Sequence, residues 1–318
     1  MTDLANTPTP NLIPLLVIGG YLGAGKTTLL NHLLRQAGGR RLAVLVNDFG
    51  DISIDANLIV GAADGVLALA GGCVCCSFGS DLVGSLVTVA QREPPPDLIL
   101  IECSGVGLPG AVARSAALAP GVQVQGVVVL TDASEIRRQL RDPYVGDTVA
   151  TQLQQADMLV LNQAERLDAP SLAALAAWLS RHAPGVPQVV CSFGQLPAEL
   201  LLDFRAAAVP DSTAEAWAGS GGRYQRPTGH AAVSDAASRF RFHTERFDGP
   251  VDLQALAARL GAPGSSLLRA KGAVQGLDGQ AWLVQVVGRR VRLSPLPGPP
   301  GPSLGRLACI SLCDTGSA

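Results

Sequence analysis

The most constraining feature of this chain is the sequence GYLGAGKT at residues 20–27. A short apolar run precedes it at residues 13–18, and an amphipathic stretch follows at residues 26–36. A strand, a glycine-rich turn and a helix in this order bind phosphates through backbone N–H groups at the helix N-terminus. In such a loop Lys26 reaches the β- and γ-phosphates, and the Thr27 hydroxyl coordinates Mg²⁺. The sequence therefore predicts a nucleotide-binding loop.

Short apolar runs alternate with amphipathic stretches from residue 12 to about residue 204. The expected strands cover residues 13–18, 42–46, 66–69, 98–102, 124–130, 158–161 and 187–191, and the expected helices cover residues 26–36, 80–91, 108–118, 147–155, 171–182 and 197–203. This order is typical of a parallel sheet with helices on both faces. The predicted fold class is an α/β P-loop NTPase with a mostly parallel sheet, and an α+β domain with antiparallel strands is the alternative.

Three segments differ in composition. Residues 1–208 form the predicted P-loop domain, residues 209–238 are a flexible linker rich in Gly, Ser, Thr and Pro, and residues 239–318 form a small α+β domain with a Pro-rich tail. Its expected elements are a strand beginning near residue 239, a helix at 252–260, and strands at 267–274 and 281–287. The prolines at residues 294–302 cannot maintain a sheet ladder, so we expect a loose tail after Leu293, apart from a closing strand at 307–312.

Composition excludes several classes of partner. Apolar residues make up 47% of the chain, yet the apolar runs last only four to eight residues, far fewer than the roughly 20 that a membrane helix needs. The N-terminus has no basic stretch ahead of an apolar one, so it is not typical of a secretory signal. Net charge is −2 without a Lys/Arg block. We therefore expect a cytoplasmic protein with neither nucleic acid nor membrane as a partner.

Carboxylates follow two of the expected strands. Glu102 ends an apolar strand and can hold the Mg²⁺ shell or orient the attacking water, while the Gly105 N–H can sense the γ-phosphate. The alternative for Glu102 is a solvent-exposed strand end. Asp48 lies in a loop that would change shape with the nucleotide. Lys26, Asp48 and Glu102 are the candidate catalytic residues.

The sequence Asn162-Gln163-Ala164-Glu165 stands where a guanine-reading loop is typically Asn-Lys-x-Asp. In that loop the carboxylate accepts hydrogen bonds from guanine, and the lysine stem packs on the base. Glu165 is one methylene longer than Asp, and Gln163 is shorter than Lys and uncharged. We expect guanine preference with reduced affinity.

Three of the seven cysteines, Cys73, Cys75 and Cys76, follow two glycines after an expected strand. They are too close together for ordinary disulfides, which favours a reducing compartment. Three thiolates supply most of a tetrahedral site for a soft metal, and an incomplete ligand set suits transfer. A redox pair and incidental cysteines are the alternatives.

The remaining thiols and imidazoles carry weaker signals. Cys309 and Cys313 would share one face of a helix as a second metal pair, but their segment fits a strand equally well. Cys103 and Cys191 lie at strand ends and are expected to be small buried residues. The four histidines are scattered along the sequence, so they are expected to be structural or solvated.

Taken together, these motifs resemble the CobW family of P-loop GTPases, which belongs with the metal-insertion GTPases that service hydrogenase and urease. The resemblance covers most of residues 12–290. Its marks are GYLGAGKTT at 20–28, NDFG at 47–50, GGCVCC at 71–76, ECSG at 102–105, Asp132, and LRAKG at 268–272.

The resemblance implies a slow GTP-hydrolysing metallochaperone. GTP and GDP would bind with Mg²⁺, the cysteines would carry Zn²⁺ or Co²⁺, and hydrolysis would release the ion to a metal-requiring client protein. The implied nucleotide-binding residues are Gly20, Gly23, Ala24, Gly25, Lys26, Thr27, Thr28, Gly105, Asn162, Gln163 and Glu165, with Thr27 on Mg²⁺ and Cys73, Cys75 and Cys76 on the transported metal. A homodimer is a candidate assembly.

Three departures from the family pattern stand out. Asp48 replaces the commoner Glu, the base loop reads NQAE, and the linker has no His-rich tract. The missing His-rich tract argues against a storage role and leaves the client open. The altered base loop keeps a second hypothesis open, a regulatory nucleotide-binding module with weak hydrolysis that senses metal or redox state. A small-molecule kinase ranks last, because it would be expected to show an Arg-rich lid and no thiol loop.

Overall fold

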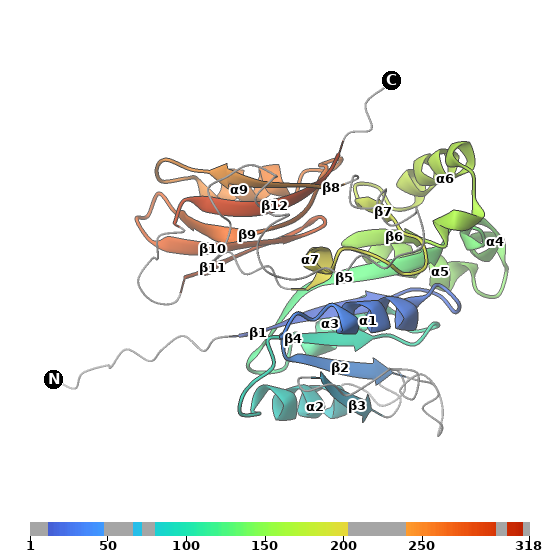
Figure 1. The fold of residues 1–318 in the computed structure, drawn as a ribbon, viewed down its shortest axis with the longest axis horizontal. Coiled ribbons are helices and arrows are strands. Elements are labelled where there is room, and N and C mark those ends of the chain that lie inside the picture. Colours follow the sequence, from blue (N-terminus) through green and yellow to red (C-terminus); the bar gives the residue numbers. More distant parts are fainter. Residues whose placement is uncertain (1–11, 48–65, 72–79, 203–239, 297–303, 314–318) are drawn as a thin grey trace.

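The structure is a computed structural model, and it describes residues 12–47, 66–71, 80–202, 240–296 and 304–313. The described residues form two sheets, one parallel and one antiparallel (Figure 1). The predicted linker at residues 209–238 lies outside the described residues. No helix in the described part of the chain is long and apolar enough to cross a membrane.

The larger sheet has seven parallel strands in the order β3-β2-β4-β1-β5-β6-β7. The apolar runs at residues 15–18, 42–46, 98–101, 127–130 and 158–161 are buried on both faces, as is typical of parallel strands covered by helices. The strands are β1 Ile13–Gly19, β2 Leu42–Asn47, β3 Val66–Gly71, β4 Leu98–Glu102, β5 Val122–Asp132, β6 Met158–Asn162 and β7 Gln188–Val190. The predicted α/β class with a parallel sheet is confirmed, and the antiparallel alternative is wrong. The phosphate-binding sequence follows β1, which lies between β4 and β5.

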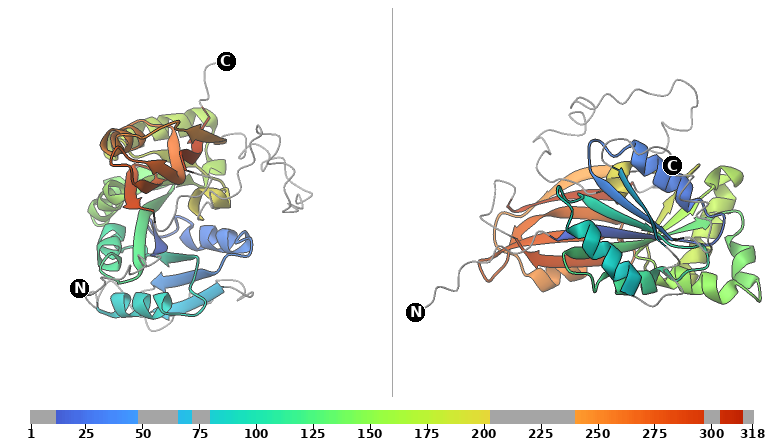
Figure 2. Two further views of the ribbon diagram at one scale, coloured as in Figure 1. Left: turned by 90° about the vertical axis from the view of Figure 1, so that its left-hand side faces the viewer. Right: turned by 90° about the horizontal axis from the view of Figure 1, so that it is seen from below.

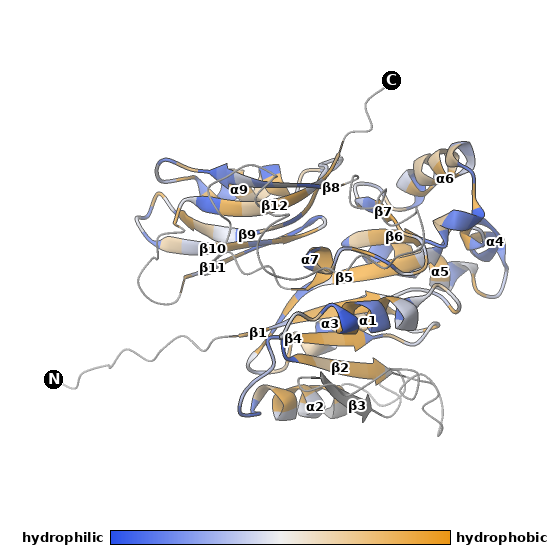
Figure 3. Cartoon of the chain, viewed as in Figure 1, coloured by the Kyte–Doolittle hydropathy of each residue, from blue (hydrophilic) through white to orange (hydrophobic). Residues whose placement is uncertain are grey.

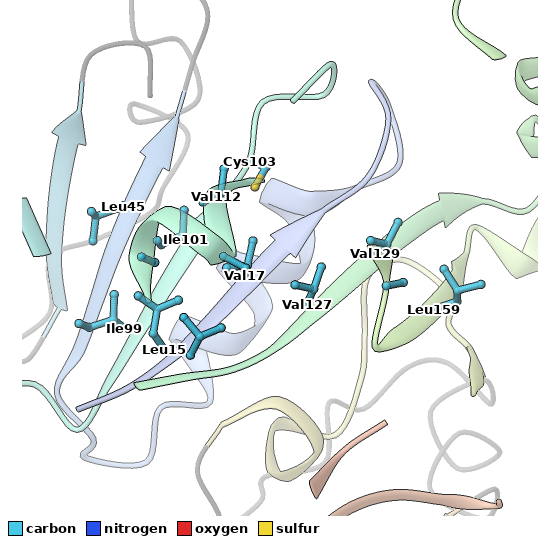
Figure 4. Close-up of a cluster of buried hydrophobic side chains, with 14 of the residues drawn as sticks. Leu15, Val17, Leu45, Ile99, Ile101, Cys103, Val112, Val127, Val129 and Leu159 are labelled. Carbon is cyan, nitrogen blue, oxygen red and sulfur yellow. The ribbon is translucent and has the colours of Figure 1, made fainter. Parts of the chain in front are cut away.

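Two apolar layers cover the faces of this sheet. The helices are α1 Lys26–Arg35, α2 Ser80–Ala90, α3 Pro109–Ala116, α4 Ile136–Arg141, α5 Gly146–Gln155, α6 Ala169–His182 and α7 Ala198–Leu201. Figure 2 shows α1 and α2 on opposite sides of the sheet. On the face of α2, α3, α5 and α6, alternate strand residues such as Leu15, Val17, Ile99 and Ile101 form one core with Val112 (Figure 4).

The second core joins the two sheets. Leu16, Val128 and Met158 from the parallel sheet belong to the same buried cluster as Leu268 and Ile310 from the antiparallel sheet. Figure 3 shows the apolar colouring concentrated along β1, β4 and β5. The C-terminal sheet therefore covers part of the face on which α1 packs.

The smaller sheet is antiparallel in the order β11-β10-β9-β12-β8, and α9 packs on it. Its elements are β8 Phe240–Arg246, α9 Leu253–Leu260, β9 Leu267–Gln275, β10 Ala281–Val287, β11 Arg290–Pro295 and β12 Arg306–Leu312. These bounds confirm an α+β unit with a closing strand.

Two elements differ from expectation. The loose tail predicted after Leu293 is wrong at its start, because Ser294 and Pro295 belong to β11 and pair with Leu283 and Trp282. Proline is tolerated there because β11 is an edge strand. The short helix α4 was also not expected from the sequence.

Candidate nucleotide-binding site

The glycine-rich loop joins the end of β1 to the start of α1, at the carboxyl edge of the sheet. Gly25 precedes α1 with φ 93°, and no side chain caps the first turn. The first N–H groups of a helix have no intrahelical partners and carry the positive end of its dipole. The loop and the start of α1 therefore suit an anionic ligand.

Two glycines of the loop allow close contacts that a side chain would prevent. Gly20 has φ 134°, and a Cβ atom there would overlap the carbonyl oxygen of Leu130 on β5. A Cβ atom at Gly25 would overlap the side-chain amide of Asn162. The loop therefore fits tightly between β5 and the predicted base loop.

Lys26 is 8% exposed, and its Nζ lies 3.4 Å from the carbonyl oxygen of Tyr21 in the same loop. The Ala24 N–H also donates to Tyr21 O at 3.2 Å. The amine of Lys26 thus lies against the loop that the sequence assigns to the phosphates.

Thr27 and Glu102 contact each other at the carboxyl edge of the sheet, next to the glycine-rich loop. Residue Ile18 of β1 is the register partner of Glu102 on β4, which brings the carboxylate beside the loop. Thr27 Oγ1 donates to Glu102 Oε1 at 2.8 Å, and Glu102 is 2% exposed. The alternative of a solvent-exposed strand end is therefore wrong. A hydroxyl and a carboxylate are hard oxygen ligands of the kind that Mg²⁺ prefers, so these residues fit that ion.

The loop after Glu102 packs against the phosphate-binding loop. Cys103 N–H donates to Ile18 O at 2.9 Å, and a Cβ atom on Gly105 would lie 2.9 Å from the backbone nitrogen of Leu22. The structure thus places Gly105 directly beside the glycine-rich loop. Gln152 of α5 donates to the carbonyl oxygens of Gly105 at 3.1 Å and Gly107 at 2.8 Å. No motif in the sequence indicates this contact.

The amides of the predicted base loop hold the phosphate-binding loop. Asn162 Nδ2 donates to Ala24 O at 2.9 Å, and Asn162 Oδ1 accepts from the Gly194 N–H at 3.0 Å. Gln163, with φ 59°, donates from Nε2 to Gly23 O at 2.8 Å. The two residues expected at the base thus connect the ends of β6 and β7 to the glycine-rich loop.

Glu165 is exposed in a short 3-10 helix at Ala164–Arg166. The Ala164 N–H donates to Cys191 O at 3.2 Å, and Arg166 lies 3.6 Å from Asp132 at the end of β5. This turn is therefore fixed to both neighbouring strands while the Glu165 carboxylate faces solvent. Phe193, which no motif in the sequence singles out, is 59% exposed at φ 54° and precedes Gly194, whose N–H donates to Asn162.

Four predicted site residues, Asp48, Cys73, Cys75 and Cys76, lie outside the described residues, and so does His230. Thr28 is exposed on the first turn of α1. No group of three or more His, Cys, Asp or Glu residues within the described ranges could hold a metal ion.

The other cysteines lie apart from the nucleotide loop or in the core. Cys103 and Cys191 are 1% and 3% exposed, which confirms that they are small buried residues. Burial raises the pKa of the Cys191 thiol to about 12 and that of the Cys309 thiol to about 11. Cys309 belongs to β12 and not to a helix, so the helical pairing with Cys313 is wrong.

Two family profiles match this chain. Residues 14–190 match the profile described as the CobW/HypB/UreG nucleotide-binding domain. Residues 240–310 match that of the cobalamin synthesis protein cobW C-terminal domain.

Several curated proteins are similar in sequence. The zinc chaperone CobW of Pseudomonas aeruginosa is 31% identical over 62% of this chain and 61% of its own length. The zinc chaperone YjiA of Escherichia coli is 31% identical over 49% of this chain and 50% of its own length. The zinc-regulated GTPase metalloprotein activator 1 of Schizosaccharomyces pombe is 31% identical over 50% and 41%. The chain thus spans less than two thirds of the length of the relatives it matches.

Among solved structures, the Zn(II)-bound YjiA GTPase from Escherichia coli is 22% identical with a TM-score of 0.45, covering 95% of this chain and 94% of that one. HypB from Helicobacter pylori in complex with nickel is 17% identical with a TM-score of 0.40, covering 58% and 81%.

Proposed function

Because the chain belongs to the CobW/HypB/UreG family of nucleotide-binding proteins, we propose that it is a GTP-hydrolysing metallochaperone. Zinc is its proposed cargo, with cobalt as the alternative, bound through Cys73, Cys75 and Cys76 and delivered to a metal-requiring client. The observation that carries the proposal is the contact between Thr27 and the buried Glu102 carboxylate beside an uncapped helix N-terminus.

The residues of the loop divide the work of phosphoryl transfer. The backbone N–H groups of the loop and of the first turn of α1 bind the phosphate oxygens, and Lys26 stabilises the negative charge that develops on them. Thr27 and Glu102 would hold Mg²⁺, which when bound neutralises charge on the phosphates. Glu102, with Asp48 of the NDFG sequence, orients the attacking water.

Guanine is the proposed base. Glu165 offers an exposed carboxylate that accepts from guanine N1–H and N2–H₂, whereas adenine presents an acceptor at N1. A relative named a zinc-regulated GTPase metalloprotein activator supports the same choice. Gln163 holds Gly23 and offers no long stem to pack on the base, so we expect weaker binding than a lysine would give.

Zinc is favoured as cargo by the chemistry of the three thiols and by the relatives named zinc chaperones. A site with three protein ligands leaves one position for a client's ligand, which allows the ion to be passed on. Cytoplasmic work fits this proposal, since closely spaced thiols stay reduced there. A homodimer is the proposed assembly to test.

A second candidate is a regulatory module that binds nucleotide with little turnover. The observation that favours it is the NQAE loop, in which the amide of Gln163 is committed to Gly23 and the carboxylate of Glu165 is one methylene longer than usual.

Metal-dependent turnover tests the proposal. The purified protein is expected to hydrolyse GTP slowly, to bind about one zinc or cobalt ion per chain, and to change that affinity between GTP and GDP. Cys75→Ala with Cys76→Ala should abolish metal binding. Unchanged metal stoichiometry in that variant contradicts the chaperone, and tight GTP binding without turnover favours the regulatory module.

A further inference from the structure

We propose that Gln152 is a positioning residue for the loop at residues 103–110, and that the last turn of α5 connects this loop to the C-terminal sheet. The inference rests on the proposed function and deepens it, because it makes the C-terminal domain a regulator of the nucleotide site. Residues 152–157 contact both the loop at residues 103–110 and the C-terminal sheet.

Gln152 matches its two acceptors closely. Its side chain is 1% exposed, and Nε2 donates to Gly105 O at 3.1 Å and to Gly107 O at 2.8 Å. A side-chain amide has two N–H donors, so one glutamine can satisfy both carbonyls. Buried donors left without acceptors are costly. Gln152 therefore fixes the loop that follows Glu102.

Gln155 holds the other end of the same loop. Its Oε1 accepts from the Gly110 N–H at 2.8 Å, in the first turn of α3. A Cβ atom on Gly110 would lie 2.7 Å from Gln155 Cδ, so a larger residue at this position would displace the Gln155 side chain. Both the middle of this loop and its last residue thus depend on α5.

The turn between β10 and β11 in the C-terminal sheet contacts the end of α5 and the residue before β6. Arg289 Nη2 donates to the carbonyl oxygen of Gln154 at 2.8 Å, and the Arg289 N–H donates to Asp157 O at 3.0 Å. Arg290 Nε lies 2.9 Å from Asp157 Oδ2. Gly288, at φ 54°, comes so close to Asp157 O that a Cβ atom would overlap it.

These contacts make the loop and the hairpin depend on one short segment. A shift of Gly105 toward a γ-phosphate must either break its bond to Gln152 or move the end of α5, and Arg289 is bonded to that end. Because coupling between two sites is reciprocal in free energy, we expect the contacts of the hairpin to affect nucleotide preference as well.

The first experiment compares Gln152→Met with Gln154→Met in the full chain. Gln154 is two residues away with an exposed side chain, and its carbonyl stays available to Arg289. We measure affinity for a non-hydrolysable GTP analogue and for GDP, and hydrogen exchange of residues 103–110 without nucleotide. Gln152→Met should lower the preference for the GTP analogue about three- to tenfold and speed exchange in the loop, while Gln154→Met changes neither.

The second experiment compares Arg289→Ala with Arg292→Ala. Arg292 lies in the same hairpin but donates to Val124 O on β5, at 2.9 Å, and not to α5. Arg289→Ala should speed exchange at residues 103–110 and reduce the preference for the GTP analogue, whereas Arg292→Ala should not. Gln152→Met and Arg289→Ala together should change the preference less than the sum of the single variants.

The outcomes separate this inference from the proposed function. If Gln152→Met keeps the wild-type melting temperature, nucleotide preference and loop exchange, the positioning role is wrong. If Arg289→Ala behaves like Arg292→Ala, the connection to the C-terminal sheet is wrong. If the wild-type protein binds no guanine nucleotide, the proposed function fails, and loop exchange alone decides the inference. Should Gln152→Met not fold, Gln155→Met replaces it with the same expectations.

Discussion

The Thr27 hydroxyl donates a hydrogen bond to the Glu102 carboxylate, with 2.8 Å between Oγ1 and Oε1. The contact joins the first turn of α1 to the end of β4 across neighbouring strands. A carboxylate buried beside the glycine-rich loop can act on the reacting groups, while other residues bind the rest of the nucleotide.

Glu102→Gln is therefore expected to lower the single-turnover rate of GTP hydrolysis about a hundredfold, because the amide cannot orient water or hold a metal shell as the carboxylate does. Affinity for GDP should change little. Glu135→Gln removes a carboxylate that pairs with Arg138 on the surface, and it should leave turnover unchanged. Equal rates in Glu102→Gln and wild type would remove Glu102 from the hydrolytic centre.

Replacing Gln163 with lysine should tighten GDP binding about two- to fivefold, because the longer cationic stem can reach Gly23 O and also pack over the base. Titration with a fluorescent GDP analogue measures the change. Competition by ATP tests the base assignment, and effective ATP binding would show that Glu165 does not select guanine.

Native thiol labelling should distinguish the cysteines. Burial raises the pKa of Cys191 to about 12 and that of Cys309 to about 11, so almost no thiolate forms at these positions near neutral pH. Iodoacetamide followed by peptide mapping is expected to leave both unmodified in the folded protein. Zinc should protect Cys73, Cys75 and Cys76 from the same reagent. Rapid labelling of Cys191 without unfolding would contradict its burial.

His32 makes stability depend on pH. Burial lowers its pKa below the usual 6.5, while Nε2 contacts Leu196 O at 2.8 Å. Below pH 6.5 the unfolded chain therefore binds a proton that the folded chain resists, and the free energy of unfolding falls as pH drops from 6.5 toward the lowered pKa. Urea unfolding between pH 7.5 and 5.5 measures this slope.

His32→Gln should flatten that slope, since glutamine can still donate to Leu196 O but does not titrate. His182→Gln is the matched control, because His182 is exposed on α6. An unchanged slope in His32→Gln would assign the pH dependence to other groups.

Much of the parallel sheet could be predicted from the sequence, because buried strands read as short apolar runs. The runs at 13–18 and 98–102 both became strands, and their register brings Glu102 to the loop. The helix α4 was missed because only Ile136 and Leu140 of its six residues are apolar. The strand β11 was missed because its last residue is Pro295 and edge pairing cannot be read from composition.

The site was predictable where a recognised motif or the end of an apolar strand carries the residue, as for Thr27 and Glu102. The glycine-rich loop was recognised as a unit, but the contact of Gln152 with Gly105 joins residues 47 positions apart. A glutamine on an amphipathic helix has the same appearance in the sequence whether it faces solvent or binds a buried carbonyl. The roles of Asn162 and Gln163 in holding Ala24 and Gly23 likewise depend on the fold.

The core shared by the two sheets has a practical consequence for dissecting this protein. Cutting the chain between residues 202 and 240 would leave Leu16, Val128 and Met158 without the partners that Leu268 and Ile310 provide. It would also leave the Asp157 carboxylate without Arg290. The amino-terminal fragment is therefore expected to self-associate or to require a solubilising fusion. Nucleotide affinities measured on this fragment would not represent those of the full chain.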